Sequence, residues 1–222
     1  MAAMTHDRDA DPVLRRPGRP ARLSPERVLD AAEALLDAEG VDAVTIRRVA
    51  ETLGVSPMAL YRHVRDKDDL LAALIDRLAR RLTRPPAADA AAPRERLLAL
   101  WRMLYDGLAQ HSWLPEVLAR RQLMAPSVLW AVEEIHAALL DAGLPLEQAV
   151  LAYRQLWQFT LGALLVRAGA SAPRPSGQAA VRGAPDAARF PLLARAAGAW
   201  RSAHGADTYG DDLAALLDAL LP

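Results

Sequence analysis

Two short helical segments, separated by a tight glycine turn, stand in the N-terminal third of the chain. Thr45 opens the first segment, Gly54 ends it, and Ser56-Pro57 begins the second only two residues later. Glycine supplies the backbone freedom that so tight a turn between helices needs. One helical segment precedes this pair and another follows it. The spacing therefore predicts a helix-turn-helix arrangement.

Capping residues define the ends of the flanking helices. Ser24 is a hydroxyl N-cap, and Pro25 and Glu26 suit the first helical turn. Gly40 ends this helix as a C-cap, and Asp66 caps a longer fourth helix. The first part of the chain is therefore predicted to hold helices near 24–39, 45–53, 56–63 and 66–82.

The remainder of the chain is also helical by pattern. After a proline-rich connector at 83–92, apolar residues recur at helical spacing, and no segment alternates as a strand does. We predict an all-α chain, in which a three-helix domain with the helix-turn-helix (22–67) is linked by the fourth helix to a C-terminal helical domain (68–222). The C-terminal helices are expected near 93–111, 114–123, 126–142, 146–168, 188–204 and 208–221.

Two segments lack helical periodicity. Residues 1–21 combine arginines with prolines and are predicted to form a disordered basic arm. Residues 169–187 are rich in glycine and proline, and we expect them to form a mobile loop of the C-terminal domain.

Composition narrows the classes of function. The formal net charge is zero, but residues 15–27 contain five arginines and only one glutamate. The distribution of charge matters more for nucleic-acid binding than its sum.

The chain has no cysteine, which excludes disulfides and thiolate metal sites. It shows no apolar run near the roughly 20 residues that span a bilayer and no apolar core of a secretory signal. We therefore expect a cytoplasmic protein with no membrane partner.

The outer face of the third predicted helix carries the residues best suited to read DNA. Small residues at its N-terminal end allow close approach within the major groove. Met58 and Ala59 suit contact with a thymine methyl group, and Arg62 suits the edge of a guanine. Tyr61 has an alternative role as a core aromatic with its hydroxyl outward, and the two roles are compatible.

The run from Thr45 to Leu71 resembles the DNA-binding domain of the TetR family of repressors. The similarity covers about residues 22–80 and includes the Gly-Val turn, the Leu-Tyr-x-His-Val end of the recognition helix and the Lys-x-x-Leu-Leu start of the fourth helix. It implies that some of these side chains bind phosphates, namely Thr45, Arg47, Tyr61, His63 and Lys67. The full predicted DNA-binding set is Thr45, Arg47, Ser56, Pro57, Met58, Ala59, Tyr61, Arg62, His63 and Lys67. The basic arm is expected either to enter an adjacent minor groove or to remain a solvated tail.

Motifs in the C-terminal half are similar to those of the tetracycline repressors, one branch of that family. They are Ala142-Gly143-Leu144, Gln158-Phe159-Thr160-Leu161-Gly162 and Phe190-Pro191-Leu192-Leu193. The resemblance implies a homodimer in which about 146–168 and 208–221 form a four-helix bundle with the partner subunit. A stripe of leucines on the last segment favours such burial, with packing inside one subunit as the alternative.

Aromatic and polar residues within the apolar C-terminal helices are candidates for a ligand pocket. The candidates are Trp101, Tyr105, His111, Trp113, Met124, Trp130, His136 and Trp157, to which Met103 and Tyr153 are added. The alternative is that each aromatic residue belongs to the core.

The pattern departs from the tetracycline repressors in the groups that hold a metal. Those proteins bind the drug as a magnesium chelate, using a histidine and an acidic residue of the partner subunit. Here the stretch after Gly162 contains no acid, and Leu118-Ala-Arg-Arg-Gln contains no histidine. We therefore expect no metal and no other cofactor, and an effector that is apolar or aromatic.

These observations predict a dimeric transcription regulator, most simply a repressor, that binds a palindromic operator and is released by a small-molecule effector. The resemblance implies that the effector acts by moving the fourth helix. An activator, or a regulator that no small molecule controls, remains the alternative. An enzyme is not expected, because Glu133-x-x-His136 has the spacing of di-iron bundles but occurs only once.

Overall fold

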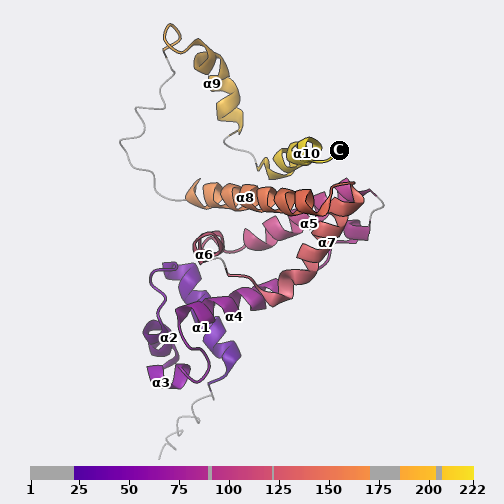
Figure 1. Ribbon diagram of the computed structural model, residues 1–222. Helices are drawn as coiled ribbons and strands as arrows, with labels where there is room; N and C mark the ends of the chain where they lie inside the picture. Colours follow the sequence, from indigo (N-terminus) through magenta and orange to yellow (C-terminus); the bar gives the residue numbers. More distant parts are fainter. Residues whose placement is uncertain (1–22, 90–91, 122, 171–185, 204–206) are drawn as a thin grey trace, which may run out of the picture.

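The computed structural model describes residues 23–89, 92–121, 123–170, 186–203 and 207–222, and within these residues every regular element is a helix (Figure 1). The N-terminal elements are α1 (Pro25–Glu39), α2 (Ile46–Leu53), α3 (Pro57–Leu60) and α4 (Lys67–Ala79). The remaining elements are α5 (Pro93–Leu108), α6 (Leu114–Arg121), α7 (Leu129–Asp141), α8 (Leu146–Ala170), α9 (Pro191–Ala203) and α10 (Tyr209–Leu220), with 3-10 turns η1 (Pro86–Asp89) and η2 (Pro126–Val128). The predicted all-α class is confirmed. The basic arm and most of the loop predicted at 169–187 lie outside the described residues.

Side-chain caps begin the helices where the sequence predicts them. The Ser24 side chain accepts a hydrogen bond from the Arg27 amide at 3.3 Å, and Thr45 accepts one from the Arg48 amide at 3.1 Å. Such bonds satisfy amides that have no partner within the helix. Gly54 ends α2 with φ +65°, a left-handed conformation that a side chain would strain.

Several helices are shorter than predicted. Helix α5 ends at Leu108 rather than near 111, α6 ends at Arg121 rather than near 123, and α7 begins at Leu129 rather than near 126, because residues 126–128 form the 3-10 turn η2.

Helix α3 ends at Leu60 rather than near His63, because the amides of His63 and Val64 both bond to the Leu60 carbonyl and close a turn that buries Val64 in the core. Helix α4 ends at Ala79 rather than at Leu82. The amides of Arg81 and Leu82 bond to carbonyls three residues earlier, and this tighter turn ends the helix before the prolines of the connector.

The core divides into two clusters that meet at α8, where Leu161 belongs to the first cluster and Leu156 and Leu164 belong to the second. The first joins α1–α4 to α6 and includes Leu36, Leu60 and Leu71. The second joins α5, α7, α8 and α10 around Trp101 and Leu156. Helix α6 therefore packs against the N-terminal helices although it belongs to the C-terminal half of the sequence (Figure 1). No single helix among the described residues is long and apolar enough to cross a membrane, although the bent pair Leu114–Arg121 and Pro126–Asp141 passes that test by length and composition alone.

Helix α10 is held by a buried tyrosine. The ring of Tyr209 stacks on Tyr105 with centroids 3.8 Å apart, and its hydroxyl lies 2.9 Å from the Thr160 hydroxyl on α8. The Thr160 hydroxyl also bonds to the Leu156 carbonyl at 2.8 Å, so this buried polar residue has partners. Burial raises the pKa of Tyr209 to about 12.

We predict that Tyr209→Phe lowers the free energy of unfolding by about 1 kcal/mol at neutral pH, because the variant loses the hydroxyl contacts. The pH dependence should also change. The native pKa of about 12 lies above the ordinary value of 10.0, so this group's contribution is complete below about pH 10 and is lost between about pH 10 and 12. Urea titrations across that range should show a steeper loss for the wild type than for the variant, and equal slopes would contradict the prediction.

Candidate nucleic-acid interface and internal cavity

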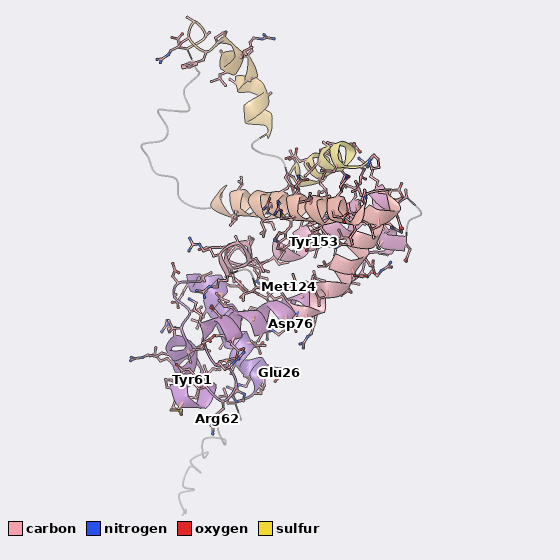
Figure 2. All side chains as sticks on the ribbon, in the orientation of Figure 1. Glu26, Tyr61, Arg62, Asp76, Met124 and Tyr153 are labelled. Atoms are coloured by element: carbon pink, nitrogen blue, oxygen red, sulfur yellow. The ribbon has the colours of Figure 1, made fainter. Side chains whose placement is uncertain are left out.

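The surface around α3 presents exposed side chains above a buried leucine. Leu60 is fully buried beneath it, whereas Met58 is 75% exposed and Tyr61 is 52% exposed. Arg62 is exposed and makes no ion pair with any described residue. Tyr61 and Arg62 lie at the end of the molecule remote from α8 and α10 (Figure 2). This end therefore offers an apolar, an aromatic and a cationic group to a partner.

The other predicted DNA-contacting residues surround this surface. Ser56 precedes α3 and makes no capping bond with its side chain, Pro57 and Ala59 belong to the helix, and His63 is exposed in the turn after it. Thr45 caps α2, and Arg47 is paired with Glu51 at 3.0 Å on the exposed face of that helix. These predicted contacts are thus brought to one end of the molecule.

Lys67 differs from the others because its charge is already engaged. Its ammonium group donates to the Val41 carbonyl at 2.6 Å, which ties the start of α4 to the loop between α1 and α2. Burial, together with the charge of Arg121, lowers the pKa of Lys67. The contact to phosphate that the resemblance implies stays a prediction.

A cavity of about 440 Å³ lies between the two core clusters. Its walls come from α4, α5, α6, α7 and α8 and from residues 123–125, and Figure 2 labels Met124 and Tyr153 on two of these walls. Most lining groups are aliphatic, and polar atoms come chiefly from Tyr153, Trp157 and Gln158. The aliphatic lining includes Ile75, Leu78, Leu82, Leu104, Leu108, Leu114, Leu118, Leu123, Val128, Val132 and Leu161.

Of the eight residues predicted to bind a ligand, Met124 and Trp157 line the cavity, as does the additional candidate Tyr153. Two others stand directly behind this lining. Trp101 packs against Tyr153 and Trp157 with centroids 5.6 and 6.5 Å apart, and His136 packs on Tyr153 at 4.8 Å.

The remaining candidates lie elsewhere. Tyr105 stacks on Tyr209, and Trp130 is half-buried against the C-terminal core. The additional candidate Met103 is also half-buried against that core. His111 and Trp113 both bond to Asp37 of α1, through Nδ1 at 3.0 Å and Nε1 at 2.8 Å. These last two residues therefore join the N-terminal helices to α6.

The cavity lining contains no histidine, aspartate or glutamate. Among the described residues, no group of three or more such side chains is arranged to hold a metal ion. The residues that line this cavity therefore do not supply the donors that a magnesium chelate needs.

Two family models together match most of the chain. Residues 28–74 match the model described as bacterial regulatory proteins, tetR family, and residues 85–220 match the tetracyclin repressor-like C-terminal domain. The chain belongs to the TetR family. This membership confirms the resemblance in both halves and favours a regulator over an enzyme.

Two curated relatives illustrate the similarity of this TetR-family chain. The tetracycline repressor protein class A from transposon 1721 of Escherichia coli is 32% identical over 201 residues, covering 90% of this chain and 91% of the relative. The HTH-type transcriptional repressor DrrR1 of Streptomyces coeruleorubidus is 32% identical over 151 residues. That match covers 67% of this chain but only 56% of DrrR1.

A solved relative shares the fold over nearly the whole length. The crystal structure of apo ActR from Streptomyces coelicolor superposes with a TM-score of 0.74 at 25% identity, covering 90% of this TetR-family chain and 96% of ActR. ActR in complex with actinorhodin gives a TM-score of 0.76 at 24% identity with the same coverage.

We predict that Asp37→Ala weakens the junction between α1 and α6. The indole N–H of Trp113, which is nearly buried, would lose its partner at a cost of about 1–3 kcal/mol. Thermal and urea unfolding should both report the loss. Glu133→Ala is the control, because Glu133 is exposed on α7 and has no ion pair with a described residue. Equal stability of the two variants would show that the Asp37 contacts do not hold the junction.

Proposed function

We propose that this chain is a homodimeric transcription repressor that binds a palindromic operator and releases it when a small apolar or aromatic effector fills the cavity. One observation carries the proposal. Helix α4 packs in the core that supports α2 and α3, and its residues Ile75, Leu78 and Ala79 also form a wall of the cavity. A single helix thus connects the effector cavity with the surface that would contact DNA.

The surface around α3 supports the DNA-binding part of the proposal. Met58 and Arg62 are exposed at the helix and the turn that follows it, where an apolar group suits a thymine methyl and a guanidinium suits a guanine. Arg47, Tyr61 and His63 are exposed beside them and suit phosphates. We thus assign base contacts to Met58 and Arg62, and contacts with the DNA backbone to Arg47, Tyr61 and His63.

The exposed face of α8 supports the dimer. Leu151 is 50% exposed and Leu165 is 39% exposed, and Gly162 lies between them with open space beside its backbone. A partner helix can approach closely at such a small residue. On α10, Leu213 and Leu217 pack inside the subunit, whereas Leu216 and Leu220 keep exposed surface. We propose that these faces of 146–168 and 208–221 pair across a two-fold axis, which matches the symmetry of a palindromic operator.

The cavity supports a small effector of mainly apolar character. Its volume of about 440 Å³ falls in the range of small-molecule sites, which extends over roughly 300–1,000 Å³. Tyr153 and Gln158 line the cavity, and we propose that they orient an aromatic ligand by hydrogen bonds. ActR is a relative of similar fold whose structure contains actinorhodin, and we propose a ligand of aromatic chemistry here as well.

We propose that release follows from a shift between two shapes of the dimer. An effector that binds one shape more tightly moves the population toward it. If that shape separates the recognition helices by a distance that no longer matches successive major grooves, affinity for the operator falls.

The DNA-binding part is tested by fluorescence anisotropy of the protein on its own upstream intergenic DNA at two salt concentrations. Arg62→Ala should weaken specific binding by about 1–3 kcal/mol and relax specificity at one base pair. Arg47→Ala should weaken binding to all sequences and reduce the salt dependence. Arg120→Ala is the matched control, since this arginine is exposed on α6. Equal effects of Arg62 and Arg120 would contradict the assignment.

The effector part is tested with a panel of polycyclic aromatic compounds that includes actinorhodin. We expect members of the panel to raise the melting temperature and to displace the operator. Trp157→Leu should weaken effector binding roughly tenfold and leave operator affinity unchanged, because the indole supplies aromatic contact in the cavity. Trp130→Leu, outside the cavity, is the control. If compounds of the panel bind the protein without displacing the operator, the result would favour the alternative hypothesis of a regulator that no small molecule controls.

A further inference from the structure

The segment between α6 and α7 forms one wall of the cavity. Leu123, Met124, Ala125 and Val128 all line the cavity, although none lies within a long helix. Met124 is 64% exposed, so the segment separates the cavity from solvent at this point. Any occupant of the cavity therefore presses on this segment as well as on the helices.

A cluster of polar groups fastens this wall segment, residues 123–128, to α4. Asp76 Oδ1 accepts a hydrogen bond from the Ser127 backbone N–H at 2.9 Å, and Arg80 Nε donates to the Ser127 hydroxyl at 3.3 Å. The same arginine pairs with Asp76 Oδ2 at 2.5 Å. Figure 2 labels Asp76 on α4 and Met124 of the wall segment.

The environment of Asp76 makes this fastening stronger than an ordinary surface contact. Its side chain is only 13% exposed, whereas that of Arg80 is 70% exposed. Burial alone tends to raise the pKa of the Asp76 carboxyl, but hydrogen bonds from Ser127 and Arg80 outweigh it and hold the pKa below its ordinary value. The carboxylate is therefore charged at neutral pH, and hydrogen bonds to a charged group are the stronger kind.

The residues beside this bond are themselves cavity residues. Ile75 precedes Asp76 on α4, and Val128 follows Ser127 on the wall segment; both side chains line the cavity. A second contact lies just before the wall segment, where Arg121 at the end of α6 pairs with Asp68 near the start of α4. The chain between α6 and α7 is thus anchored to α4 at two points, with the cavity lining between them.

We propose that Asp76 is a positioning residue that couples the cavity to the DNA-binding surface by holding the wall segment to α4. An occupant that displaces residues 123–128 pulls on α4 through Asp76. This inference rests on the proposed release of the operator by an effector. It assigns to a single carboxylate the part of the transmission that runs through the wall segment, beside the direct contact of α4 with the cavity.

Loss of Asp76 should therefore separate binding from response. Without the carboxylate, an occupant that displaces the wall segment no longer pulls α4 with it. The variant should still bind its operator and still accept an occupant, but each event should affect the other much less. This loss is a loss of coupling free energy, which is distinct from a loss of affinity at either site.

The absence of cysteine allows a test that needs no knowledge of the natural effector. Ala119 lines the cavity and is exposed on α6, so Ala119→Cys provides one thiol at its edge. Benzyl methanethiosulfonate then attaches one aromatic group, which a reducing agent removes again. Operator affinity is measured by anisotropy for the labelled and unlabelled full-length protein, and the ratio of the two dissociation constants reports the coupling.

In the parent Ala119→Cys chain we expect the label to weaken operator binding at least tenfold. With Asp76→Ala added, the ratio should fall at least threefold, while the unlabelled protein keeps operator affinity within about threefold of the parent. Asp141→Ala is the matched control, because it removes an Asp–Arg pair of 2.6 Å between α7 and α5, away from α4. The control should keep the full ratio.

The remaining outcomes distinguish the two proposals. A full ratio in the Asp76→Ala protein would overturn the role of Asp76 while leaving effector release intact. A ratio near one in the parent chain would overturn effector release, and the role of Asp76 with it. If Asp76→Ala does not fold, Asp76→Asn decides, since it keeps an acceptor for the Ser127 N–H but loses the charge. Its ratio should fall at least threefold, and an unchanged ratio would overturn the proposal.

Discussion

The packing of α4 is the constraint on which the rest of the structure depends. Leu70, Leu71 and Leu74 are fully buried among α1, α2 and α3, and the next turns of the same helix place Ile75 and Leu78 against the cavity. Protein interiors are close-packed, so displacement of one end of such a helix is passed to its neighbours rather than absorbed. The N-terminal surface and the cavity are therefore parts of one mechanical unit, although they lie in different parts of the sequence.

Polar contacts, in addition to the apolar core, join several points of this unit. Arg77 of α4 pairs with Asp30 at 2.5 Å and with Glu33, and these two residues lie on α1. Asp37 of α1 holds His111 and Trp113, and Asp76 holds Ser127. Arg77, Glu33 and Asp76 are largely buried, so these contacts are stronger than exposed ion pairs, which contribute about 0–1 kcal/mol each. They tie α1, α4 and the segments around α6 together at defined points.

Local chemistry explains how much of the fold could be predicted. Ser24, Thr45 and Asp66 cap helices by bonds within their own first turn, so sequence alone located those starts. The end of α3 could not be predicted in the same way, because the burial of Val64 among distant residues decides it. The functional cavity shows the same limit. Met124 and Trp157 were among the candidates, but the aliphatic wall from α4 has the sequence pattern of an ordinary core helix.

The separation of the two recognition helices in the dimer tests the central claim most directly. A nitroxide on Thr52→Cys, exposed on α2 of the otherwise cysteine-free chain, reports that separation by double electron–electron resonance, because α2 packs against the recognition helix α3. Without effector we predict a distribution of label-to-label distances that is consistent with half-sites about 34–36 Å apart. The tightest-binding member of the aromatic panel should shift that distribution. An unchanged distribution at an effector concentration that abolishes operator binding would contradict the account.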